Sequence, residues 1–219
     1  ERSGSDLLLF DQGSPVASIS DFFLTATPPD LVAANGAVLP GALAARLAGS
    51  SIDAQFAQNA GAGTSIPIGQ VEIVEGLATV QRLDGSVDKL EVGTKIFQND
   101  ILSTTVDGKV SVTFSDGTIF SLAQSSRMVI DTLVYDPAGS QNEGGFTLLT
   151  GGFVFIAGQV AKTGDMEVNT PTATLGIRGT TVGVQFDVVD GVAVLNVKLY
   201  TDSDGRIGSI ELTDLEGNL

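Results

Sequence analysis

Apolar side chains recur at every second position from Gln70 onward. The segments VEIVEG, KVSVTFS, TIFSLA and MVIDTLVY are short, bounded by turn residues, and rich in β-branched and aromatic side chains. A period of two places alternate side chains on opposite faces of an extended chain, so the pattern predicts half-buried β-strands. GFTLL and GFVFIAGQVAK are expected to form two further, separate strands.

The sequence between these segments is typical of tight turns. Asp-Gly pairs supply the positive φ angles that two-residue hairpin turns need. The expected turns are Asp84-Gly85, Asn99-Asp100, Asp107-Gly108, Asp116-Gly117 and Gly144-Gly145. About a dozen strands at spacings of roughly 8–12 residues indicate an all-β fold, an antiparallel β-sandwich or roll. No long helical pattern follows Ile66, which argues against a parallel α/β sheet.

The first 65 residues have a different character. Residues 1–23 hold two short apolar runs around a Gly-centred turn, which predicts a β-hairpin. Residues 24–65 are rich in Ala, Pro and Gly, and LPGALAARLAGS within them places leucines four residues apart, which indicates a short helix. The chain is therefore divided into an N-terminal region, 1–65, and a β domain, 66–219.

The tail beyond residue 180 is predicted to form three strands joined by Asp-Gly turns. Its apolar alternation needs a surface to pack against, so these strands are expected to complete the same sheet. Segment 206–214 is expected to form part of a final hairpin that leaves one strand edge unpaired.

Composition limits the chemistry of the protein. Eleven basic residues stand against 26 acidic ones, a net charge of −15, and this field repels nucleic acid and anionic membrane surfaces. The chain has no cysteine and no histidine, which excludes Cys-His and Ser-His-Asp catalysis and ordinary zinc sites. The longest nearly apolar stretch, 153–158, is too short to span a bilayer, so no membrane insertion is expected.

The run VNTPTATLGIRGTTVGV, residues 168–184, carries one charged residue, Arg178. Alternation places this guanidinium on the threonine side of the strand, between Gly176 and Gly179. Its five donors suit carbonyl oxygens at a strand end, so we expect Arg178 to brace main chain. The alternative is an anion-binding arginine in a glycine-rich loop. No Walker-type lysine and helix accompany it.

These residues also carry a family resemblance. The pattern TP-x-AT-x-G-x-RGT, formed here by Thr170, Pro171, Gly176, Arg178, Gly179 and Thr180 with the residues between them, resembles the end of a FecR-type domain. Three earlier segments resemble the family's preceding strands: VEIVEGLATVQRLDGSVDKLEVGTKIFQNDILST, KVSVTFSDGTIFSLAQSS and FTLLTGGFVFIAG. The resemblance covers about residues 70–184. It implies a β fold and, from the family's use in iron-citrate signalling, a periplasmic sensor that relays the state of a receptor.

The spelling of the terminal motif, together with the N-terminal hairpin and the Pro/Ala-rich segment, is similar to FecR-type domains near the N-termini of very large, secreted, calcium-dependent repeat proteins of cell surfaces and biofilms. The expected function is therefore a non-catalytic structural or interaction module of an extracellular, cell-surface, adhesin-like protein. It would act through contacts with neighbouring domains, identical copies or an outer-membrane partner, and it needs no cofactor.

Two alternatives stay open. One is the periplasmic sensor domain, and the other is a calcium- or glycan-binding module. Asp202, Asp204 and Glu211 are the candidate calcium ligands, although Tyr200 stands where an EF-hand loop requires its first aspartate. The other acidic residues are scattered among turns, and the chain has no tryptophan and only two tyrosines to stack against a sugar, which argues against a glycosidase.

Overall fold

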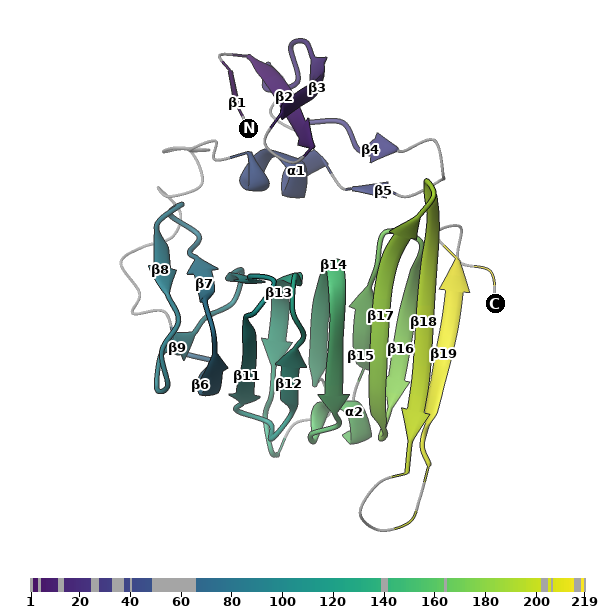
Figure 1. Cartoon of the computed structure of the whole chain (residues 1–219). Helices are drawn as coiled ribbons and strands as arrows, with labels where there is room; N and C mark the ends of the chain where they lie inside the picture. Colours follow the sequence, from purple (N-terminus) through teal and green to yellow (C-terminus); the bar gives the residue numbers. More distant parts are fainter. Residues whose placement is uncertain are drawn as a thin grey trace. The chain divides into compact units, whose positions relative to one another are not determined.

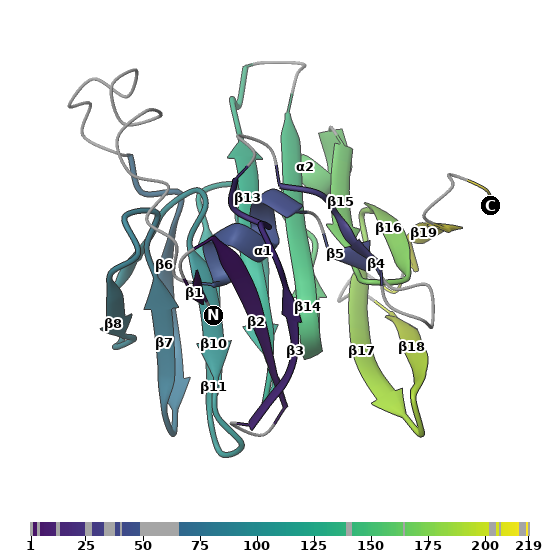
Figure 2. The ribbon, with the colours of Figure 1, turned by 90° about the horizontal axis from the view of Figure 1, so that it is seen from above.

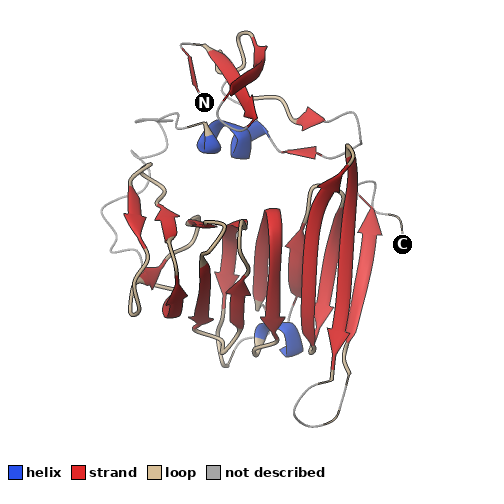
Figure 3. Cartoon of the chain, viewed as in Figure 1, coloured by secondary structure: helices blue, strands red, loops and turns tan. Residues whose placement is uncertain are grey.

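The chain forms two compact units in the computed structural model, Glu1–Thr64 and Ser65–Leu219 (Figure 1). The structure describes residues 2, 3, 5–11, 14–24, 28–32, 38, 39, 41–48, 66–138, 142–163, 165–201, 205, 207–214 and 218. Strands dominate these residues and helices are short, as Figure 3 shows.

The smaller unit contains the predicted hairpin. Strands β2 (Asp6–Asp11) and β3 (Ser14–Ile19) pair antiparallel, and β1 (Arg2–Ser3) extends the sheet beside β2. Strands β4 (Leu31–Val32) and β5 (Val38–Leu39) form a second, short pair, followed by helix α1 (Gly41–Leu47). The short helix predicted from LPGALAARLAGS is therefore confirmed.

A separate core stabilises this smaller unit. Leu7 and Phe22 are buried against three alanines on and just after α1, Ala44, Ala45 and Ala48. The rings of Phe22 and Phe23 pack edge to face, with centroids 5.1 Å apart. The rest of the Ala/Pro/Gly-rich region, residues 49–65, lies outside the described residues.

The larger unit is one 14-stranded sheet with a single short helix among its described residues. The elements, in chain order, are β6 (Gly69–Glu75), β7 (Ala78–Gln81), β8 (Val87–Lys89), β9 (Lys95–Ile96), β10 (Ile101–Thr104), β11 (Lys109–Phe114), β12 (Ile119–Leu122), β13 (Arg127–Val134), β14 (Glu143–Ile156), α2 (Val160–Thr163), β15 (Asp165–Asn169), β16 (Ala173–Arg178), β17 (Thr181–Val189), β18 (Val192–Tyr200) and β19 (Ser209–Asp214).

Strand β14 joins the two halves of this sheet. Its first part pairs with β13 and β15, which belong with β7, β8, β10, β16 and β19. Its second part pairs with β12 and β17, which belong with β6, β9, β11 and β18. The change of partners occurs at Gly151, whose φ of 79° is readily available only to glycine. One long strand therefore serves both halves of the sheet.

The two halves enclose one apolar core. Phe120 of β12 contacts Phe146 from the first part of β14 and Phe153 from its second part, with centroid distances of 4.9 and 4.5 Å. Aromatic pairs at such separations add about 0.5–1.5 kcal/mol beyond their buried area. The core-facing residues of β11, β13, β16 and β17 complete this cluster, in the alternation that the sequence predicts.

The predicted fold class, an antiparallel all-β sandwich or roll, is confirmed, and so are several of its turns. Gly85, Gly117 and Gly191 have positive φ, and Asn99 has φ of 69°. The Gly144-Gly145 turn is wrong, because both glycines lie inside β14. GFTLL and GFVFI belong to that same strand, and the following residues turn into α2 rather than continuing the strand.

The tail also differs from prediction. β17 and β18 form a long hairpin around Asp190-Gly191, shown in yellow-green in Figure 1 and from above in Figure 2. β19 does not pair with β18. It crosses to the other half of the sheet and pairs antiparallel with β16. The expected final hairpin over 206–214 is therefore replaced by one strand at the opposite sheet edge.

Candidate functional site

The terminal motif begins with a turn that Thr170 closes. The Thr170 hydroxyl donates to the Ala173 carbonyl at 2.8 Å and accepts the Ala173 amide at 3.0 Å. The Thr170 amide also donates to the Ala173 carbonyl at 2.8 Å. Pro171 lies within this turn, where its fixed φ costs little. Thr170 and Pro171 thus set the entry into β16.

Arg178, at the end of β16, is exposed. It borders a small depression of about 210 Å³ whose lining includes Glu167 of β15, Gly176 and Glu211 of β19. Within the described part of the chain, the guanidinium makes no hydrogen bond or ion pair with another residue. The expected brace between Arg178 and main chain is therefore not seen.

Main-chain groups beside Arg178, and not its guanidinium, connect this turn to its neighbours. The Gly179 amide donates to the carbonyl of Ala161 in α2 at 2.9 Å, and φ of Gly179 is 57°. A Cβ on Gly208 would lie 2.4 Å from the carbonyl oxygens of both Arg178 and Gly179. Thr180 is fully buried. The motif fastens its turn through close main-chain packing, which leaves the guanidinium in solvent.

Gly176 differs from the other sheet glycines in this unit. An alanine Cβ there would meet Glu211 at 3.6 Å, an ordinary van der Waals distance, and φ of Gly176 is not positive. We therefore predict that Gly176→Ala raises the free energy of unfolding by about 0.5–1 kcal/mol, because alanine loses less conformational entropy on folding. Urea denaturation of the two proteins measures the difference. A less stable variant would show that the backbone needs this glycine.

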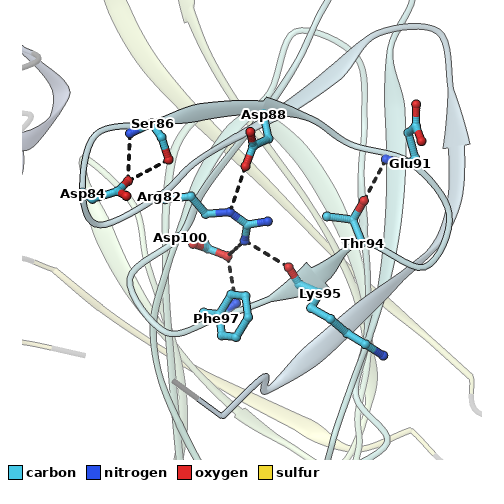
Figure 4. Close-up of polar contacts among 9 residues, drawn as sticks. All are labelled: Arg82, Asp84, Ser86, Asp88, Glu91, Thr94, Lys95, Phe97 and Asp100. Atoms are coloured by element: carbon cyan, nitrogen blue, oxygen red, sulfur yellow. Dashed lines mark hydrogen bonds and ion pairs between the residues drawn. The ribbon is translucent and has the colours of Figure 1, made fainter. Parts of the chain in front are cut away.

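A second arginine, Arg82, makes the kind of main-chain contact that was expected of Arg178. Arg82 Nη1 lies 2.6 Å from Asp100 Oδ2 and donates to the Lys95 carbonyl at 3.0 Å (Figure 4). The same Asp100 oxygen accepts the Phe97 amide at 2.8 Å, and the guanidinium lies 5.4 Å from the centre of the Phe97 ring. Asp100 is 1% exposed, so its charge depends on these partners. This cluster ties the β7–β8 hairpin to the turn before β10.

Neighbouring polar groups in Figure 4 are turn contacts in solvent. Asp84 Oδ1 accepts the Ser86 hydroxyl at 2.7 Å and the Ser86 amide at 2.9 Å. These two hydrogen bonds lower the pKa of Asp84 below its ordinary value, because they favour the carboxylate. Asp88 reaches Arg82 Nε at 3.5 Å from an exposed position. These groups support the hairpin and form no enclosed site.

A second buried carboxylate, Asp116, holds the main chain between β14 and α2. Asp116, 3% exposed, accepts the Thr118 amide at 3.0 Å, the Thr118 hydroxyl at 2.7 Å and the Val160 amide at 3.1 Å. The Thr118 hydroxyl in turn accepts the Gly158 amide at 3.2 Å. A Cβ on Gly158 would lie 2.3 Å from the Thr118 nitrogen. The turn Asp116-Gly117-Thr118 thus accepts hydrogen bonds from the main chain between β14 and α2. We call these two acceptor side chains, Asp116 and Thr118, the Asp116 cradle.

Strand β18 is the least protected sheet edge of the larger unit. Among the strands that the structure describes, its nine residues pair only with β17, without an irregularity in register. The other edges are β8, with three residues, β9, with two, and β19, with six. β19 also carries Glu211 and Asp214, and charges and short length are the usual protection of an edge. β18 carries one charge, Lys198, and no proline.

The turn before β18 sets the direction of its amides. Asp190 and Gly191 have φ of 52° and 78°, the signature of a type I′ turn. The flanking pair, Val189 and Val192, is then a hydrogen-bonded pair, and bonding alternates along the ladder. The amides of odd-numbered residues on β18, Ala193 to Leu199, therefore point away from β17. With their carbonyls, they form a row of donors and acceptors that face no other strand among the described residues.

Apolar side chains accompany this free edge. Val188, Val189 and Val192, at the tip of the hairpin, are 59%, 54% and 61% exposed. On the core side of β18, Leu195 and Val197 are only partly buried, and Leu199 is 38% exposed. An additional strand beside β18 would cover the apolar side chains of β18 itself, Val192, Leu195, Val197 and Leu199, which favours an interaction at this edge.

The two tyrosines lie in different environments. Tyr135 packs against the core. The Tyr200 ring lies over Gly183, where a Cβ would be 3.1 Å from it, and Lys198 Nζ is 4.9 Å from its centre. Tyr200 and Lys198 border a shallow groove of about 680 Å³ that is also lined by Gln185 and Asn196. A single aromatic ring is a small platform for a sugar, and glycan binding stays a prediction.

The calcium prediction falls largely outside the described residues, because Asp202 and Asp204 are not described. Glu211 is exposed on β19, beside Gly176. In the described ranges, no group of three or more acidic residues is arranged to hold a metal ion. No helix among those ranges is long and apolar enough to cross a membrane.

Sequence reasoning missed the roles of Arg82 and Asp116, although signals existed. Asp100 and Asp116 both stand in short turns between strongly apolar strands, where a carboxylate that becomes buried needs hydrogen-bond partners. Neither position reveals its partner, because Arg82 and Val160 are 18 and 44 residues away in the chain.

Comparison with known proteins gives one family. Residues 100–200 match the family model described as FecR protein. The match runs from Asp100 of the ion-pair cluster to the end of β18, and so includes the Asp116 cradle, β14 and the terminal motif. It starts later than the resemblance seen in the sequence and extends further at its end. No curated protein and no solved structure matches the chain significantly.

Proposed function

We propose that the FecR-matching larger unit is a non-catalytic, sensor-type protein-interaction module that binds a partner protein by strand addition at β18. The single observation that carries this proposal is the nine-residue edge of β18, whose outward amides and carbonyls have no strand beside them in the described part of the chain. An added strand would hydrogen-bond to those groups, which is a recurring mode of protein recognition.

The position of β18 in the sheet is suited to transmitting the effect of a bound partner to the rest of the unit. β18 pairs with β17 along its whole length, and β17 pairs with the second part of β14, the strand that serves both halves. A partner that orders β18 therefore stabilises a ladder that reaches the centre of the unit. The FecR match favours the sensor setting, because the resemblance implies a domain that transmits the state of a receptor.

Photo-crosslinking in the native cell tests the docking strand. A photoreactive amino acid at position 196 of β18 is expected to give a protein adduct, and the same group at position 88 of β8 is not. Val197→Pro provides the matched control, since it removes an outward amide and spares the ladder to β17. The adduct should disappear in this variant. An adduct that persists in Val197→Pro, or none at position 196, would contradict the proposal.

The cellular setting has a test of its own. The sensor reading places the module in the periplasm, whereas the adhesin-like reading places it on the cell surface. Protease added to intact cells is expected to leave the native protein uncut and to cut it once the outer membrane is permeabilised. Cleavage in intact cells would favour the extracellular, adhesin-like setting.

A further inference from the structure

We infer that the strand that docks on β18 is β18 of a second copy of this chain, paired antiparallel about Asn196. The inference rests on the proposed function, because it names the partner of the same edge. It follows from the geometry of the strand, its side-chain pattern and its charges, each of which favours the same register.

The strand length selects the register. β18 runs from residue 192 to residue 200, so among antiparallel pairings only the one centred on Asn196 brings all nine residues opposite a partner. The outward amides belong to odd-numbered residues, and in this register Ala193 meets Leu199 of the second copy and Leu195 meets Val197. These four residues therefore exchange main-chain hydrogen bonds across the two-fold axis.

The side chains on the core side match in this register. Ala193, Leu195 and Val197 are partly buried against the core. In the pair, each of these side chains meets an apolar residue of the second copy, and Leu199, 38% exposed, gains a neighbour. The apolar core of one copy then continues into the other, with burial of surface that the single chain leaves in water.

The opposite side contains no like-charge contact. Lys198 lies opposite Val194 of the second copy, and Tyr200 lies opposite Val192, an aromatic and β-branched pair that stabilises sheets. The two Lys198 residues are four positions apart along the strands, about 13 Å, which exceeds the screening length of about 8 Å at physiological ionic strength.

The net charge of each chain opposes this pairing. Two copies at −15 repel each other over the whole molecule, while the strand contact is apolar and made of backbone hydrogen bonds. Added salt screens the repulsion and leaves the strand contact intact. The dimer is therefore expected to become tighter as the NaCl concentration rises from about 50 to 500 mM.

A charge-swap experiment on the full chain tests the register. Asn196 is opposite itself, with Cα atoms about 4.5 Å apart in a pair that lacks direct hydrogen bonds. By sedimentation velocity, the wild type is expected to form dimers as its concentration rises. Asn196→Lys alone and Asn196→Asp alone should each weaken dimerisation at least about tenfold, since like charges then face each other. An equimolar mixture of the two should restore dimers, because only the mixed pair opposes unlike charges.

Two outcomes would overturn the inference. If the wild type stays monomeric at every concentration and salt, β18 does not pair with itself. If dimers form but neither charge variant weakens them, a different surface makes the contact. The first outcome leaves the proposed function in place when position 196 still crosslinks to a different protein. Loss of that crosslink as well would reject both. Val197→Pro serves as the reference monomer throughout.

Discussion

Asp100→Ala is expected to lower the free energy of unfolding by about 2–3 kcal/mol. The substitution removes the carboxylate that pairs with Arg82 at 2.6 Å and accepts the Phe97 amide at 2.8 Å, and so leaves two donors without their acceptor. Breaking one side of a buried ion pair costs about 3–5 kcal/mol. The Arg82 side chain is 19% exposed and recovers part of its hydration, which reduces the expected cost.

Urea denaturation of Asp100→Ala and Arg178→Ala in parallel gives the decisive comparison. Arg178 is exposed and its guanidinium has no partner within the described ranges, so its removal is expected to change stability by less than about 0.5 kcal/mol. Asp88→Ala is a control for charge, because it removes an exposed carboxylate on the same arginine. A larger loss of unfolding free energy for Arg178→Ala than for Asp100→Ala would show that Arg178 stabilises the fold more than the Arg82–Asp100 ion pair does.

Gly158→Ala is expected to destabilise the larger unit by about 3 kcal/mol or more. An added Cβ would lie 2.3 Å from the Thr118 nitrogen and 2.6 Å from Asp116 Oδ2, distances that real Cβ atoms do not reach. The segment before α2 must move, and its movement breaks the hydrogen bonds from Gly158 and Val160 into the Asp116 cradle. Overpacking and lost buried hydrogen bonds both contribute to the cost.

Gly176→Ala is the matched control, since it adds the same methyl group to the same unit at a position with room for it. The two variants are expected to change stability in opposite directions in the same urea titration. A Gly158→Ala protein with unchanged stability would show that the cradle is not closed around Gly158.

Much of the fold was predictable because it follows from local rules. Strict alternation in segments such as 109–114 and 127–134 fixes which side chains face the core, and Asp-Gly pairs fix where the chain reverses. The short helix in the N-terminal region likewise follows from leucine spacing and its flanking Pro and Gly. These features depend on residues that are close in sequence.

The remaining features depend on contacts between distant residues. Gly144-Gly145 resembles a turn, yet Met166 packs where a Gly144 side chain would stand, so the glycines allow β14 to pass close to β15. β19 has the pattern of a hairpin strand, but Ile210 pairs opposite Ile177 on β16. Local periodicity cannot specify such partners, because several strands present the same alternation.

In the candidate site, too, local features were predictable from sequence and features set by distant contacts were not. The terminal motif was found by its pattern, but a lone arginine among small residues has no local partner that decides between bracing and exposure. The free edge expected at 206–214 is present, because β19 pairs only with β16 among the described strands, but the longer free edge of β18 was not predicted, because it follows from the pairing of β19 with β16 instead of β18. Residues that build a sheet edge are visible in sequence, whereas the absence of a neighbour is a property of the whole topology.

Amide hydrogen exchange along β18, resolved by residue, tests the central claim most directly. In dilute protein, the amides of Ala193, Leu195, Val197 and Leu199 are expected to exchange rapidly, while those of Val194, Asn196 and Lys198, bonded to β17, are protected. Raising the protein concentration, or adding a protein captured through position 196, should protect the first set selectively. If the amides of these four odd-numbered residues are already protected in the dilute monomer, or stay unprotected in the complex, β18 is not the docking strand.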